Sequence, residues 1–260
     1  MSKRQESNLG MRTDRRNAGI SKLLPGPFYS YAKAYSPAAI QEVHDTIEIF
    51  IEDHGPFDGV LGFSQGASMA LSYLLQRTID KPNDSLPFKF AIFFSSVAAL
   101  SADGNYCRII LESITDEQML AMSDFPSSSF EGLGPEARVF CTSLAHAVIS
   151  ARTAGALQAA EENCFADGDV SRVPRVMHPL FIHERVKIPT VHVSGKRESP
   201  LLLGISALMR SLCDGQLARQ VTHGNGHDLP TRPADVQATR AAIEWAVELG
   251  QADVVCKSRI

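Results

Sequence analysis

The sequence has no apolar run that approaches the roughly 20 residues of a membrane-spanning helix, so we expect no membrane span. We also expect no secretory signal, because residues 1–16 are polar, rich in Arg and Lys, and contain no hydrophobic stretch. Neither sign of charge is in large excess. With a net charge of −4, neither nucleic acid nor an anionic membrane surface is an expected main partner.

Cysteine is scarce and has no paired spacing. The 260 residues contain five cysteines without a C-x-x-C motif, which argues against a disulfide framework and a zinc site. We expect free thiols, no bound metal and a cytoplasmic location. The last residues, Ser258-Arg259-Ile260, loosely resemble the S-K-L peroxisomal address, and a frayed polar tail is the alternative interpretation.

The most informative feature that is present is the pentapeptide Gly62-Phe63-Ser64-Gln65-Gly66. It follows the apolar residues 59–61 and precedes the helix-forming residues 67–71, so G-x-S-x-G stands between a strand and a helix. This is the setting of a nucleophile elbow, in which glycines two residues from a strained serine let the chain cross over itself. The turn would expose the Ser64 oxygen and direct the N–H of Gln65 toward a developing oxyanion.

Short apolar runs alternate with segments of helical periodicity along the chain. This alternation predicts an α/β fold with a mostly parallel sheet and helices on both faces. Expected strands are 58–63, 89–94, 188–195 and 216–222, and expected helices are 37–54, 65–77, 201–213 and 236–249.

The segment between the second and third expected strands is too long for a simple connection. Residues 96–187 contain predicted helices at 107–122 and 140–162, and an insertion above the sheet edge is typical of a lid over a substrate pocket. The alternative is a subdomain that has no catalytic importance. Residues 1–24 show no periodicity, so we expect a loose N-terminal segment ahead of one domain over residues 25–260.

A serine nucleophile requires a base, and in this type of fold the histidine follows the last strand. Two histidines do so, His223 and His227, separated by the loop Gly224-Asn225-Gly226. The loop allows the backbone to return toward the elbow, so His227 is the preferred base and His223 is interpreted as a structural turn residue.

The orienting acid should follow a late strand. Glu198 is the carboxylate directly after the expected strand 188–195, and it stands beside two cations, so a solvated loop glutamate is the competing interpretation. Asp228 adjoins the histidine in sequence, where the geometry of an acid–base pair is rarely reached, and Asp214 lies past a helix. Glu198 is therefore the expected acid.

With these residues in place, the chain resembles the fungal FSH1-type serine hydrolases, an OVCA2-related branch of the α/β-hydrolases. The matching segments are residues 55–67, which include the elbow, then 188–195 and 226–230. The resemblance implies an α/β-hydrolase fold, Ser64 as nucleophile, His227 as base and Glu198 as acid, without a cofactor. Family members cleave carboxylic esters or thioesters, and several accompany polyketide synthases and release the acyl chain from the carrier protein.

The chain departs from the family pattern at two points. Aspartate is usual where Glu198 stands, and members begin with a strand and a Leu-His-Gly turn that supplies the second oxyanion donor. Residues 1–24 contain neither, so we expect the first strand to be missing. Two hypotheses follow: an active esterase or thioesterase that works through an acyl-enzyme, or a catalytically impaired scaffold that binds an acyl chain or a partner protein. Acyl transfer to an alcohol or amine would use the same triad.

Overall fold

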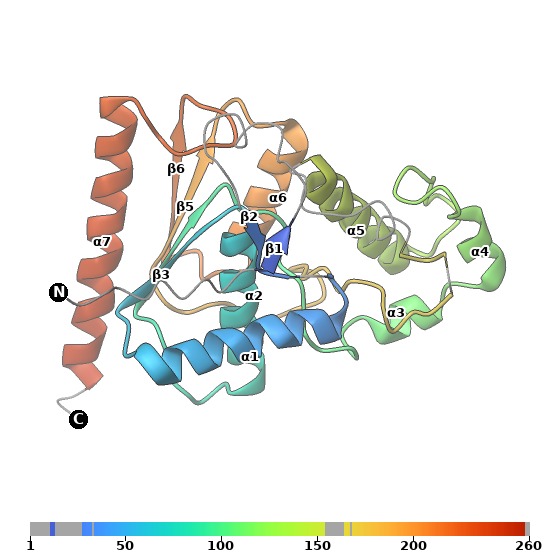
Figure 1. Ribbon diagram of the computed structural model, residues 1–260, viewed down its shortest axis with the longest axis horizontal. Helices are drawn as coiled ribbons and strands as arrows, with labels where there is room; N and C mark the ends of the chain where they lie inside the picture. The colour runs from blue at the N-terminus through green and yellow to red at the C-terminus, as the bar shows by residue number, and fades with distance from the viewer. Residues whose placement is uncertain (1–10, 14–27, 33, 154–163, 167, 258–260) are drawn as a thin grey trace.

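A four-stranded parallel sheet with the order β3-β4-β5-β6 forms the centre of the computed structural model (Figure 1). The structure describes residues 11–13, 28–32, 34–153, 164–166 and 168–257. The strands are β3 (Gly59–Phe63), β4 (Phe90–Phe94), β5 (Thr190–Gly195) and β6 (Ala218–His223). Every neighbouring pair is parallel, as the alternation of strands and helices predicts.

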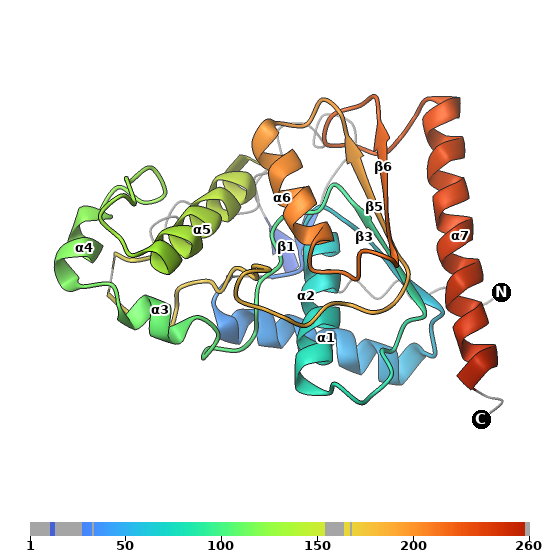
Figure 2. The same cartoon turned by 180° about the vertical axis from the view of Figure 1, so that it is seen from behind.

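Helices cover both faces of this sheet, and the side chains of β4 show why. Successive residues of a strand point to opposite faces. Ala91 and Phe93 pack into a core that also contains residues of α1 (Pro37–His54), α2 (Gln65–Asp80) and α6 (Pro200–Arg210). Ile92 and Phe94 belong to a second core, against α7 (Pro233–Lys257), which lies alone on its face in Figure 2. The continuously apolar β4 is therefore buried on both sides.

The predicted insertion contains α3 (Arg108–Glu112), α4 (Asp116–Ala121) and α5 (Pro135–Thr153), which extend away from α7 (Figure 1). A continuous helix over 107–122 is wrong, because Thr115 starts a new helix with a capping box that includes Gln118. The second helix begins at Pro135, five residues before the predicted start at residue 140, since proline suits a first helical turn. Residues 154–163, where that helix was predicted to end, lie outside the described part.

Near the N-terminus, β1 (Met11–Thr13) pairs antiparallel with β2 (Phe28–Ser30) in a separate two-stranded sheet. The sequence pattern predicted no strand in residues 1–24, and β1 is too short to show a period. Among the described strands only β4 pairs with β3, which is therefore the first strand of the sheet as described, and Leu61 on it is 63% exposed. The rest of residues 1–24 and the tripeptide 258–260 lie outside the described part.

Within the described part of the chain, no helix combines the length and apolar character needed to cross a bilayer. In the described part of the chain, Cys107, Cys141 and Cys213 are free thiols. Burial raises the pKa of Cys141 and of Cys213 to about 12, so these two stay protonated at neutral pH.

Candidate active site

The four parallel strands end side by side, and three of them, β3, β5 and β6, are followed by a residue of the candidate site. Phe63 pairs with Phe94, Phe94 with Val193, and Gly195 with His223. Because the carboxyl ends of these strands share one sheet edge, the loops that follow them meet there. Ser64, Glu198 and His227 all lie on those loops.

Ser64 is the single residue between β3 and α2, and its backbone is strained. Its φ is 53° and its ψ is −116°, outside the regions that residues with a side chain favour. Its N–H donates to the Phe94 carbonyl at 2.8 Å, and its own carbonyl accepts from the N–H of Ser68 at 3.1 Å. These two hydrogen bonds hold the turn that sequence analysis predicts as a nucleophile elbow.

The two glycines of the motif have different surroundings. A Cβ on Gly62 would lie 2.4 Å from the backbone nitrogen of Ala67, so the turn requires glycine at this position. A Cβ on Gly66 would instead meet a ring carbon of Tyr31 at 3.3 Å. At Gly66 the constraint therefore comes from the segment ahead of α1 rather than from the turn itself.

His227 reaches the serine from the loop after β6. Its Nε2 lies 2.9 Å from Ser64 Oγ, and its ring packs 5.3 Å from the ring of Phe63, centroid to centroid. The Asn225 side chain fixes the loop by donating to the Leu229 carbonyl at 2.8 Å and to Thr231 Oγ1 at 3.0 Å. Of the two histidines considered from the sequence, the structure brings His227 to the serine.

The other histidine, His223, is fully buried, and its Nδ1 accepts from the N–H of Asn225 at 3.3 Å. The loop after β5 and the loop after β6 run close together, and the Lys196 N–H donates to the His223 carbonyl at 2.8 Å. A Cβ on Gly195 would stand only 2.0 Å from the carbonyl oxygen of Gly226. The missing side chain at Gly195 is thus what lets the histidine loop cross the end of β5.

Glu198 is buried rather than solvated, with its side chain 1% exposed. Its Oε1 lies 3.6 Å from His227 Nδ1, which is longer than a hydrogen bond and makes the contact an electrostatic one. The same oxygen accepts from Ser95 Oγ at 2.6 Å and from the Gly195 N–H at 3.4 Å. The rejected carboxylates lie elsewhere: Asp228 is exposed and accepts from the N–H of Leu229, and Asp214 accepts from the N–H of Gln216.

These contacts decide the charge of the acid. Burial raises the pKa of Glu198, but contact with His227 and hydrogen bonds from Ser95 and the Gly195 N–H outweigh burial and hold that pKa below its ordinary value. Glu198 is therefore ionised at neutral pH. An anion beside Nδ1 favours the tautomer whose Nε2 faces Ser64 as a proton acceptor.

Gln65, the residue after the serine, begins α2 and is held through its side chain. Its Oε1 accepts from the Tyr31 N–H at 3.0 Å, and its Nε2 donates to the Tyr35 hydroxyl at 2.9 Å. The stretch that leads into α1 is therefore tied to the predicted oxyanion residue. The sequence motif did not indicate these contacts, because Tyr31 and Tyr35 carry no pattern of their own.

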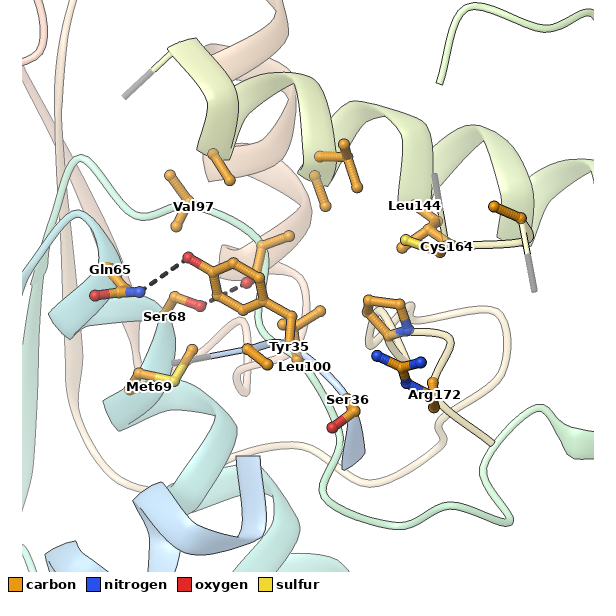
Figure 3. A pocket seen from close by; sticks show the side chains of 17 residues that line it. Tyr35, Ser36, Gln65, Ser68, Met69, Val97, Leu100, Leu144, Cys164 and Arg172 are labelled. Carbon is orange, nitrogen blue, oxygen red and sulfur yellow. Dashed lines mark hydrogen bonds between the residues drawn. The ribbon is translucent and has the colours of Figure 1, made fainter. Parts of the chain in front are cut away.

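An apolar cavity of about 230 Å³ opens beside Gln65 (Figure 3). Tyr35 and Gln65 stand at one end, and Arg172 at the other. Helix α5 forms one wall with Leu144, Ala147, Val148 and Ala151, and α2 and the loop after β4 contribute Ser68, Met69, Val97, Ala98 and Leu100. Residues from the insertion therefore line a cavity that borders Gln65, the residue after the serine.

A strained serine between a strand and a helix, a histidine nitrogen 2.9 Å away and a buried carboxylate behind it define a serine hydrolase of the α/β-hydrolase fold. Residues 28–239 match the family model described as Serine hydrolase (FSH1), and the chain belongs to that family.

Curated relatives agree with this assignment. The esterase alnB of Emericella nidulans is 39% identical over 234 residues, covering 90% of this chain and 82% of the relative. The serine hydrolase cnsH of Penicillium expansum is 31% identical and covers 88% of this chain and 93% of its own. The hydrolase FUB4 of Fusarium oxysporum is 30% identical, and the match covers 80% of this chain and 73% of the relative. The protein is a serine hydrolase of the esterase type.

Proposed function

We propose that Ser64, His227 and Glu198 are the catalytic triad of this hydrolase and that it cleaves a carboxylic ester or acyl thioester through an acyl-enzyme. The observation that carries the proposal is the 2.9 Å contact between His227 Nε2 and Ser64 Oγ, made across 163 residues of chain. A contact of this length lets the imidazole take the hydroxyl proton as the oxygen attacks.

Each group has one task in the two half-reactions. Ser64 Oγ attacks the acyl carbon while its proton moves to His227 Nε2, and the imidazolium is stabilised by the anionic Glu198. The N–H of Gln65, at the start of α2, is the assigned oxyanion donor, and the loss of one such donor costs about 2.7–4 kcal/mol. His227 then protonates the leaving alcohol or thiol, and a water molecule activated by the same nitrogen hydrolyses the acyl-enzyme.

The cavity beside Gln65 supports an apolar acyl group as the part of the substrate that is held. Its wall is built by small and aliphatic side chains of α5 and α2, and an alkyl or polyketide chain gains from burial against such surfaces. The finer proposal is an acyl thioester on the carrier domain of a polyketide synthase, released as the acid. It draws on membership of the FSH1 family, in which the resemblance described above implies that several members release acyl chains from polyketide synthases.

Labelling with a fluorophosphonate tests the triad directly, because the probe reacts only with an activated serine. We expect rapid labelling of the wild type and none of Ser64→Ala, with His227→Ala strongly slowed. Ser113→Ala, at an exposed serine outside the site, is the control and should label like the wild type. Labelling that persists in Ser64→Ala would overturn the assignment of the nucleophile.

The class of substrate is tested by comparing matched acyl thioesters and oxoesters of increasing chain length. Faster turnover of long apolar thioesters supports carrier-bound release, and a preference for short oxoesters would contradict it. Product analysis with added alcohols or amines reports acyl transfer in place of hydrolysis. A folded wild type that binds acyl chains but neither labels nor hydrolyses would instead show an impaired, acyl-binding scaffold.

A further inference from the structure

Ser95 follows β4 as Ser64 follows β3, and like Ser64 it has a positive φ. Its φ is 47°, in the left-handed region that residues with a Cβ seldom adopt. The Ser95 N–H donates to the Val193 carbonyl at 2.7 Å, which ties this turn to the neighbouring strand β5. A strained non-glycine residue at a functional edge is a reason to ask what its side chain does.

The side chain of Ser95 is directed to the acid of the triad. Its Oγ lies 2.6 Å from Glu198 Oε1, and Ser95 is 1% exposed, so no water competes for this hydrogen bond. An ionised carboxylate only accepts hydrogen bonds, so the hydroxyl must donate to it and favours the charged form. The bond also fixes the oxygen that faces His227 Nδ1 at 3.6 Å.

Glutamate has a particular need for such a donor. Its side chain has one more rotatable bond than that of aspartate, so more conformations must be excluded before its oxygen faces the imidazole. The other described donor to Oε1 is the Gly195 N–H, at a long 3.4 Å. The Ser95 hydroxyl is therefore the shortest contact that holds Glu198 in place.

We propose that Ser95 is a positioning residue for this hydrolase: its hydroxyl keeps Glu198 ionised and aimed at His227. This rests on the triad proposed above. Removal of the hydroxyl should lower kcat roughly 10- to 100-fold, which corresponds to the loss of one hydrogen bond to a charged group.

Removal should also move the acid limb of the kcat/KM profile to higher pH. The carboxylate loses a donor that favours its charged form, so the pKa of Glu198 rises. The ionised Glu198 that orients the imidazole then forms only at a higher pH.

Two substitutions separate the hydroxyl from the backbone. Ser95→Ala removes the hydroxyl and keeps the Cβ, whereas Ser95→Gly removes it and also relieves the positive φ. If the hydroxyl matters, both variants lose kcat and shift the acid limb. If Ser95 only shapes the turn, Ser95→Gly retains wild-type kinetics. Ser95→Gly also covers the case in which Ser95→Ala folds poorly.

Ser194→Ala is the matched control, because Ser194 is equally buried on β5 and its hydroxyl has no hydrogen-bond partner in the described part of the chain. It should behave as the wild type. If folded Ser95→Gly has wild-type kcat and an unmoved acid limb, and Ser64→Ala still abolishes labelling, the role of Ser95 is overturned and the triad stands. If Ser64→Ala labelled normally, the triad itself would be refuted instead.

Discussion

Gly195 offers the sharpest test of how the site is assembled, because it never touches the serine. In Gly195→Ala the new Cβ would lie 2.0 Å from the Gly226 carbonyl oxygen and 2.4 Å from that of Asn225. Both are backbone atoms, and real Cβ contacts are not shorter than 3.0 Å. The loop that carries His227 must therefore retreat by about 1 Å, a misplacement that typically costs about 100-fold in rate.

The same displacement would lengthen the 2.9 Å contact between His227 Nε2 and Ser64 Oγ beyond hydrogen-bond range. We expect kcat and the rate of fluorophosphonate labelling to fall about 100-fold, with the melting temperature lowered by only a few degrees. Gly215→Ala is the control, since nothing lies within 4 Å of its added Cβ. A folded Gly195→Ala enzyme with wild-type kcat would refute the claim that this close approach sets the position of His227.

Three further results follow from the described contacts. Glu198→Gln removes the charge but keeps the shape, and steady-state assays should show kcat lower by up to about 10⁴-fold; a loss below tenfold would mean that Glu198 is not the acid. Burial lowers the pKa of His44 from 6.5 to about 4, so the fold favours neutral His44 and loses about 3 kcal/mol as pH falls through that window. Melting curves of His44→Gln should therefore depend less on pH in that range than those of the wild type, and equal dependence would contradict the assignment. Ala147→Phe, in the cavity wall, should lower kcat/KM for long acyl chains and spare acetyl esters, whereas a uniform loss would place the acyl chain elsewhere.

The sequence could predict those parts of the site that depend on a contiguous motif or on the order of the strands along the chain. The elbow is a contiguous motif whose glycine at position 62 is required by a backbone contact within the same turn. Glu198 and His227 followed from the order of strands, because the loops after parallel strands gather at one edge. The contacts of His227 with Ser64 and with Glu198 agree with that reasoning, while the catalytic roles of these residues stay predictions.

What sequence missed depends on contacts between distant segments. Ser95 is an ordinary residue after a strand, and the role proposed for it depends on its contact with Glu198, 103 residues later in the chain. Tyr31 and Tyr35 were likewise unremarkable until the segment before α1 was found bonded to Gln65. The helix break at Thr115 had a local signal in its capping box, which the periodicity of residues 107–122 obscured.

The position of β3 at the end of the described sheet has a consequence for the motions of the enzyme. Of the described strands, the one that leads into Ser64 is paired on one side only, and Leu61 on it is exposed. Edge segments open more readily than central ones, so amide hydrogen exchange in β3 should be faster than in β4 or β5. Brief opening of this strand would separate the nucleophile from His227 while the rest of the sheet stays folded. Activity would then fall on warming before global unfolding begins, and an acyl chain that bridges Ser64 and the cavity should slow exchange in β3 most.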